Sequence, residues 1–121
     1  MHTNKLKASE RVVSTILSDR SIKTVVLVTP PDVDHTLFSF TTCHRGRYSN
    51  YPPYGLGVLG ANLREIGAEV TLVNLNSRIL RDAQETLTEN DFDFEDSWKS
   101  ELDLELSRIR PDLIGVTCMF S

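Results

Sequence analysis

A glycine-rich segment is the first place where residue types and spacing suggest chemistry. Residues 55–60 read Gly-Leu-Gly-Val-Leu-Gly, which fits the Gly-x-Gly-x-x-Gly pattern that binds the pyrophosphate of a dinucleotide. That chemistry needs the first glycine in the turn directly after the first strand, whereas the β-branched run before it ends far upstream, at Thr29. Asn74 and Asn76 also stand where an acidic residue would bind the ribose. The pattern is therefore weak as a nucleotide fingerprint, and we expect its small residues to let a helix lie close to the sheet.

The polar stretch over residues 30–54 holds the side-chain types that metal and phosphate sites use. These side chains are Asp32, Asp34, His35, Cys43, His44, Arg45 and Arg47. No pair among them has a recognisable metal-ligand spacing, so a polar surface loop is the plainer interpretation. If the stretch binds a ligand, Arg45 and Arg47 would pair with phosphate, and Tyr48 or Tyr51 would cover a flat ring.

Composition limits the classes of function. The chain has 121 residues, enough for one domain with a core, and 25% of them are charged. The net charge of −4 does not favour nonspecific binding to nucleic acid or to anionic membranes. Cys43 and Cys118 form no disulfide framework and are expected to be thiols of a reducing compartment. Because the N-terminus has no long apolar run, we expect neither a signal peptide nor a membrane span, and a cytoplasmic protein.

The first half of the chain predicts a helix, a strand and a long connection. Residues 9–18 read as a short helix in an N-terminal extension that covers residues 1–22. Lys23–Thr29 is a continuous β-branched run, which is typical of a strand buried on both faces. From Pro30 to Tyr54 there is no clear periodicity. Loops of that length in compact domains are usually functional or disordered.

The second half alternates helices with strands. Leu56, Leu59, Leu63 and Ile66 predict one apolar helical stripe, Gly67 predicts its C-cap, and a strand follows from Val70 to Leu75. We expect further helices over residues 77–87 and over Trp98–Ile109, with an acidic surface segment between them. Residues 111–121 predict a third strand of buried character. This order predicts an α/β fold with a three-layer, Rossmann-like (flavodoxin-like) parallel sheet, incomplete at its C-terminus.

Three segments together resemble the N-terminal cobalamin-binding domain of radical S-adenosylmethionine enzymes. They are VVLVTPP (Val25–Pro31), YPPYGLGVLGANLREIGAEVTLVNLN (Tyr51–Asn76) and PDLIGVTCMFS (Pro111–Ser121). In that family a Pro-Pro-x-Gly-Leu turn begins a helix that ends at Arg-Glu-x-Gly, and a Pro-Asp-hydrophobic-Gly strand follows. The resemblance covers residues 23–121, which would form the cobalamin-binding-like domain.

The resemblance implies that cobalamin lies across the C-terminal ends of the strands. The expected cofactor-binding residues are Thr29, Pro30, Pro31, Tyr51, Pro53, Gly55, Leu56, Gly57, Thr117, Cys118, Met119 and Ser121. S-adenosylmethionine and an iron–sulfur cluster are expected only in a downstream radical domain, the partner that would perform radical methylation or related chemistry. The chain has no three-cysteine cluster motif, so no catalytic residue and no metal ligand is assigned to it.

The axial histidine motif of other cobalamin proteins, Asp-x-His-x-x-Gly, is not matched. Here residues 32–37 read Asp-Val-Asp-His-Thr-Leu, which lacks both the spacing and the glycine. The Ser-x-Leu element after the third strand is matched loosely, by Thr117-x-Met119. An axial role for His35 therefore does not follow from the resemblance.

Two interpretations from other classes stay open. One is the N-terminal Rossmann-like half of a two-domain glycosyltransferase, which also has a glycine-rich helix ending in Gly-x-Glu-Val. The other is a noncatalytic α/β interaction domain that binds no cofactor. A Cys-x-x-x-Cys-x-x-Cys motif beyond Ser121 in the parent reading frame would favour the cobalamin interpretation over both.

Overall fold

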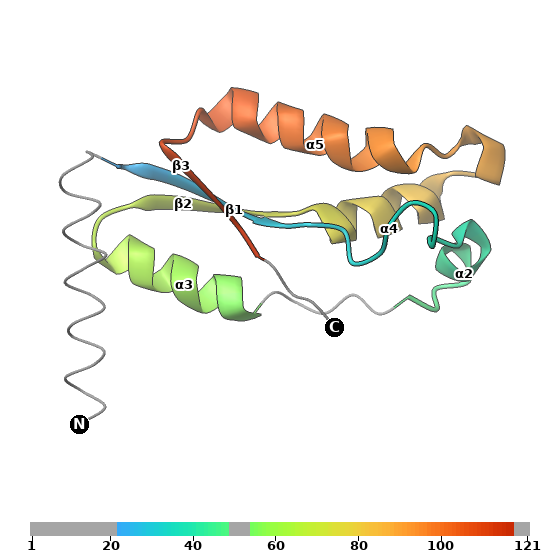
Figure 1. Cartoon of the computed structure of the whole chain (residues 1–121), viewed down its shortest axis with the longest axis horizontal. Coiled ribbons are helices and arrows are strands. Elements are labelled where there is room, and N and C mark those ends of the chain that lie inside the picture. The colour runs from blue at the N-terminus through green and yellow to red at the C-terminus, as the bar shows by residue number, and fades with distance from the viewer. Residues whose placement is uncertain (1–21, 49–53, 118–121) are drawn as a thin grey trace.

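The computed structural model describes residues 22–48 and 54–117, which form a parallel sheet with helices on both faces (Figure 1). The elements in chain order are β1 (Thr24–Thr29), α2 (Phe40–His44), α3 (Tyr54–Glu65), β2 (Glu69–Asn74), α4 (Leu75–Glu85), η1 (Glu89–Asp91), α5 (Phe94–Ile109) and β3 (Leu113–Val116). The strand order is β2-β1-β3, and both pairings are parallel. The expected α/β class with a parallel sheet is thus confirmed for these residues. The helix expected over residues 9–18 lies outside them.

The central strand β1 carries the core of both layers. Val25, Val26, Leu27 and Val28 are at most 3% exposed, as the β-branched run predicts. Side chains of a strand alternate between its faces, so β1 supplies two clusters. On one face its residues pack with Leu63 of α3 and Val70 of β2, and on the other with Val73, Leu75 and the apolar stripe of α5. That stripe consists of Trp98, Leu102, Leu106 and Ile109, as the sequence predicts.

The C-terminus of α3 has the expected glycine stop. Gly67 has a φ of +97°, a region that glycine adopts without steric cost. Its N–H donates to the Arg64 carbonyl at 3.1 Å, and the Ala68 N–H donates to the Leu63 carbonyl at 3.1 Å. These two bonds are those of a Schellman motif, and Ala68 and Leu63 share the same core cluster.

The buried stripe of α3 differs from the predicted one. Leu63 is buried and Leu56 half-buried, but Leu59 and Ile66 are 44% and 41% exposed. Helix α3 instead faces the sheet through Gly60, where an added Cβ would lie 3.4 Å from Val70 Cγ1. Because a glycine brings the helix backbone close to the strands, the line of contact runs through Leu56, Gly60 and Leu63.

The boundary between β2 and α4 also differs from the prediction. Leu75 was expected to end the strand, and the helix was expected to begin at Ser77. In the structure the Asn74 side chain accepts a hydrogen bond from the Ser77 N–H at 2.9 Å, so Asn74 is the N-cap and α4 begins at Leu75. Leu75 is nonetheless buried, at 2% exposure, because it enters the same cluster as Val73.

The long connection after β1 contains a helix and a core of its own, so its expected lack of regular structure is wrong in part. Helix α2 begins after Ser39, whose hydroxyl accepts from the Thr42 N–H at 3.2 Å. Cys43 is buried against Leu80 and Ala83 of α4. Four aromatic side chains pack around them, namely Phe38, Phe40, Tyr48 and Phe92. Helix α4 continues from the end of β2 beyond the sheet, and α2 lies at its far end (Figure 1).

Strand β3 is not buried as expected. The exposed fractions of Leu113, Ile114 and Val116 are 42%, 47% and 55%. Among the described residues β3 pairs with a strand on one side only, and α5 packs over β1 and β2. Its apolar residues therefore face solvent although Val26, the register partner of Ile114, is fully buried.

Candidate functional site

The carboxyl ends of β1 and β3 meet at one edge of the sheet. Val28 is in register with Val116, and the Thr117 N–H donates to the Val28 carbonyl at 3.1 Å. Thr29 and Thr117 therefore lie side by side, and the half-buried Pro30 and Pro31 continue directly from Thr29. Parallel sheets bind ligands at this edge. The structure thus brings together Thr29, Pro30, Pro31 and Thr117, four residues that the family resemblance assigns to a cofactor site.

The first turns of α3 present two glycines to open space. Apart from the adjacent residues and the backbone of α3 itself, no atom of the described residues lies within 4 Å of a Cβ added to Gly55 or Gly57. The predicted close packing therefore holds for Gly60 and is wrong for these two. Leu56 between them points to the core cluster under α3, so it contributes to packing. A glycine inside a helix costs about 1 kcal/mol relative to alanine, and no contact within the described residues repays that cost.

Five of the expected site residues cannot be placed in this geometry. They are Tyr51, Pro53, Cys118, Met119 and Ser121, which lie outside the described residues. The candidate residues that can be placed are Thr29, Pro30, Pro31 and Thr117 at the strand ends, and Gly55 and Gly57 on α3, with Leu56 between these two glycines packed against the core.

A hydrogen-bonded pair that the sequence did not reveal lies at the same end of the sheet. The Asp32 N–H donates to Asn76 Oδ1 at 3.0 Å, and Asn76 Nδ2 donates to Asp32 Oδ2 at 3.2 Å. Asn76 is only 7% exposed. The sequence signal was present, because an asparagine in an otherwise apolar stretch needs a partner when buried, but the partner lies 44 positions away.

Cys43 and His44 do not form a nucleophile–base pair. The Cys43 thiol is buried and donates to the Leu80 carbonyl at 3.4 Å, and its burial raises its pKa. The His44 ring is exposed, and its Nε2 lies 3.0 Å from the Thr86 carbonyl oxygen. A high thiol pKa and a base turned elsewhere both oppose thiolate chemistry.

The remaining polar residues of the loop also lack a shared site. His35 Nδ1 lies 2.9 Å from Asp34 Oδ1 and 3.4 Å from Glu95 Oε1, on the exposed surface. A hydrogen bond from the Thr36 hydroxyl lowers the pKa of Asp34. Within residues 22–48 and 54–117, no three His, Cys, Asp or Glu side chains are grouped so that they could hold a metal ion.

The proposed ring-covering role of Tyr48 does not fit its position. Its ring stacks on Phe38, with centroids 5.4 Å apart and planes inclined by 10°. Its hydroxyl accepts a hydrogen bond from the Ser39 N–H at 2.8 Å. Tyr48 therefore stabilises the loop against α4, while Arg45 and Arg47 next to it are exposed.

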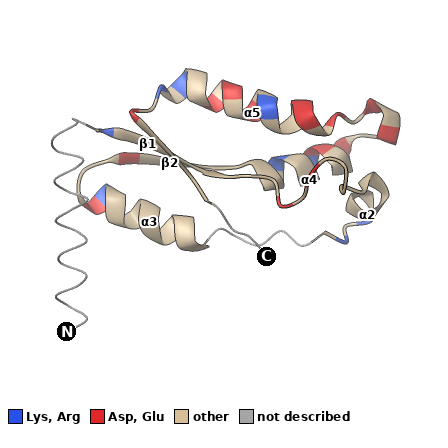
Figure 2. Cartoon of the chain, viewed as in Figure 1, with Lys and Arg blue, Asp and Glu red and all other residues tan. Residues whose placement is uncertain are grey.

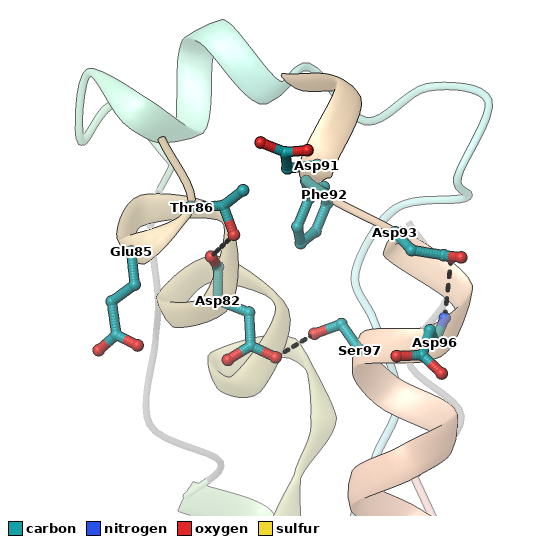
Figure 3. A pocket seen from close by; sticks show the side chains of 8 residues that line it. All are labelled: Asp82, Glu85, Thr86, Asp91, Phe92, Asp93, Asp96 and Ser97. Carbon is teal, nitrogen blue, oxygen red and sulfur yellow. Dashed lines mark hydrogen bonds between the residues drawn. The ribbon is translucent and has the colours of Figure 1, made fainter. Parts of the chain in front are cut away.

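Away from these residues, a cavity of about 270 Å³ lies between the end of α4 and the start of α5 (Figure 3). It is lined by Asp82, Glu85, Thr86, Asp91, Phe92, Asp93, Asp96 and Ser97. Acidic residues gather on this part of the molecule, whereas α3 carries few charges (Figure 2). Four of the five carboxylates that line it accept hydrogen bonds within the fold: Asp82 from the Ser97 hydroxyl at 2.6 Å, Asp93 from the Asp96 N–H, Asp91 from the Thr88 hydroxyl and Asp96 from the Ser100 hydroxyl. These hydrogen bonds give most of the acidic residues around the cavity a structural role, so we assign no ligand to it.

Comparisons with protein-family models, curated proteins and solved structures gave no match to this chain. Across the described residues, no helix has both the length and the apolar character needed to cross a lipid bilayer.

Proposed function

We propose that this chain is the cobalamin-binding module of a radical S-adenosylmethionine enzyme. The cofactor would lie against the carboxyl edge of the sheet, at the ends of β1 and β3 and at the first turns of α3. The proposal begins from the three sequence segments that resemble that family. The strand order β2-β1-β3 supports it, because this is how the flavodoxin-like order 2-1-3-4-5 begins, and that fold binds its ligand at the β1/β3 switch point.

The observation that carries the proposal is the space beside Gly55 and Gly57, which no other described part of the chain fills. Gly57 follows the first three residues of α3 and lowers helix stability relative to alanine, and neither Gly55 nor Gly57 is required by a neighbouring atom in the described residues. They lie on the helix whose start follows the Pro-Pro turn of the family motif. A large flat cofactor that approaches the helix backbone would account for both glycines.

In this module the protein would supply shape and hydrogen bonds. Thr29 and Thr117 carry hydroxyls at the strand ends, and Pro30 and Pro31 form a stiff wall beside them. Bound cobalamin would supply the organometallic reactivity, and the iron–sulfur cluster and S-adenosylmethionine would belong to the downstream domain. His35 is not proposed as an axial ligand, because its ring lies between the carboxylates of Asp34 and Glu95.

Titration of the full-length protein with hydroxocobalamin, followed by absorbance and calorimetry, tests the proposal. A Gly57→Ala variant should bind cobalamin about tenfold more weakly, which corresponds to about 1.4 kcal/mol. The same variant should be more stable by up to about 1 kcal/mol, because alanine favours the helix. Opposite signs for binding and stability would separate a ligand contact from a folding defect.

Asn62→Ala is the matched control, because Asn62 is an exposed residue of the same helix. It should raise stability slightly and leave cobalamin affinity unchanged. Absence of cobalamin binding by the full-length protein would contradict the proposal. Unchanged affinity in Gly57→Ala would remove α3 from the site.

A noncatalytic interaction domain is the second candidate, and the exposed apolar residues of β3 favour it. Leu113, Ile114 and Val116 are each more than 40% exposed. An exposed strand without charged residues invites pairing with another strand. Association through this edge in a protein that binds no cobalamin would support this function over the first.

A further inference from the structure

The Asp32–Asn76 pair lies where β1 and β2 end. Thr29 is in register with Asn74, the last residues of their strands. Asp32 and Asn76 follow them closely, and two hydrogen bonds of 3.0 and 3.2 Å join them. This pair therefore bridges the β1/β2 side of the carboxyl edge just beyond the paired strands.

The start of α4 on that side is filled by the chain's own groups. Asn74 Oδ1 accepts from the Ser77 N–H, and the Asp32 carboxylate lies against the Asn76 amide in the first turn. A carboxylate near a helix N-terminus is favourable, because the helix dipole is positive there. On the β1/β3 side, the Thr117 N–H donates to the Val28 carbonyl and so pairs the ends of β1 and β3.

The two residues between Thr29 and Asp32 are both proline. Each proline ring fixes φ near about −65°, so this segment has little freedom once its two ends are held. β1 holds one end, and the Asn76 side chain holds the other. The path of Pro30 and Pro31 along the candidate site thus depends on Asn76.

We infer that Asp32 and Asn76 are positioning residues: together they close the β1/β2 side of the carboxyl edge and hold Pro30–Pro31 in place, which confines the ligand to the β1/β3 side. The inference rests on the proposed function for the identity of the ligand. The hold of Asn76 on Asp32 can be tested without any ligand.

A charge rearrangement within the pair provides the test. Asn76→Asp removes the Nδ2 donor to Asp32 Oδ2 but keeps an acceptor for the Asp32 N–H, so the effect depends on the two carboxylates that it places face to face. Repulsion between these two charges should move Asp32 away from residue 76 and expose the Asp32 N–H to solvent. In the full-length protein, the Asp32 amide should exchange with solvent faster, and the Kd for hydroxocobalamin should rise about tenfold, or about 1.4 kcal/mol. The double variant Asp32→Asn/Asn76→Asp restores a donor opposite an acceptor. The backbone amide of residue 32 should again exchange slowly with solvent, and most of the affinity for hydroxocobalamin should return.

Two further variants keep the result interpretable. Asp32→Ala leaves the buried Asn76 and the backbone bond to it in place, so it should fold even if Asn76→Asp does not, and it should weaken cobalamin binding to a smaller extent. Asp34→Asn changes another exposed carboxylate of the same loop, which bonds to Thr36, and should leave the affinity unchanged.

The outcomes separate this inference from the function it rests on. If the unmodified protein binds no cobalamin, the proposed function fails, and the amide exchange rates alone decide whether the pair holds Asp32. If the unmodified protein binds and Asn76→Asp exchanges faster with unchanged affinity, the positioning role is overturned. Equal exchange rates in Asn76→Asp and the unmodified protein would overturn it as well.

Discussion

The two outer strands of the sheet, β2 and β3, differ in whether side chains protect their edges. On β2, the Glu69 N–H donates to the Lys23 carbonyl, so by the alternation of a parallel ladder the Val70 carbonyl points away from β1. The Arg64 Nη2 donates to that carbonyl at 2.7 Å. Strand β3 consists of Leu-Ile-Gly-Val and carries no charged residue. One edge is therefore capped by a side chain, and the other is apolar and exposed.

This difference indicates where the sheet can be extended. Natural edge strands are usually guarded by charges, prolines or bulges, because unpaired backbone groups invite another strand. Arg64 and Glu69 provide such a guard for β2. On β3, Leu113 continues the core layer of Val25, and Ile114 continues that of Val26, since these residues are in register. The β3 edge thus has the residue pattern of an interior strand and the exposure of an outer one.

Val26 of β1 and Ile114 of β3 are register partners, and replacing each by alanine should change the free energy of unfolding by very different amounts. Val26→Ala should lower the free energy of unfolding by about 2–3 kcal/mol, because Val26 is fully buried and the change leaves a cavity. Ile114→Ala should cost less than about 1 kcal/mol, because nearly half of that side chain is already in water. Urea unfolding of both variants measures the difference. An equal cost would mean that Ile114 is covered in solution and that the β3 edge is not exposed.

A smaller effect is expected when the guard on β2 is removed. Arg64→Ala deletes the donor to the Val70 carbonyl and should cost about 1 kcal/mol, the net value of one hydrogen bond. It should also increase self-association, measured by sedimentation velocity over a range of concentrations. Glu65→Ala changes the next residue of the same helix and serves as the control. If Arg64→Ala and Glu65→Ala sediment alike, the Arg64 side chain does not prevent association through the β2 edge.

The smallest effect is expected from Asp112, which directly precedes β3 and makes the stability of the fold depend on pH. Asp112 Oδ2 accepts from the Lys23 N–H at 2.8 Å and from the Thr24 N–H at 3.1 Å, which lowers the pKa of Asp112 below its ordinary value of 3.8. A carboxyl with a lowered folded pKa adds stability above its unfolded pKa, and this stability is lost as the pH falls through the folded pKa. Asp112→Asn should therefore flatten the fall in melting temperature below about pH 4, a range set by that ordinary value. An unchanged slope would show that Asp112 does not anchor β3.

Much of the scaffold could be predicted because its signals are local. The β-branched run gave β1, the glycine at position 67 gave the end of α3, and the spacing of Trp98 to Ile109 gave the buried face of α5. The start of α4 was misplaced because an asparagine serves equally as a strand end or an N-cap. Helix α2 was missed because its aromatic and thiol side chains are buried only against Leu80 and Ala83 of α4.

The candidate site was predictable only as a set of segments. Thr29 and Thr117 are both at strand ends, and a parallel sheet places such ends at one edge. The role of each glycine was not predictable, since Gly57 and Gly60 have the same local sequence character and differ only in what faces them. The partner of Asn76 was equally hidden, because only the folded chain brings Asp32 to it.

The amino-acid sequence alone is enough to predict the alternation of helices and strands and the buried central strand β1. These follow from hydrophobic periodicity and from turn residues, which act over a few neighbouring positions. Only the folded chain specifies that Gly60 packs against Val70 while no other described residue packs on Gly55 and Gly57, that Arg64 donates to the Val70 carbonyl, and that Asn76 bonds to Asp32. Each of these depends on atoms distant in sequence meeting within hydrogen-bond or van der Waals distance, which no local pattern specifies.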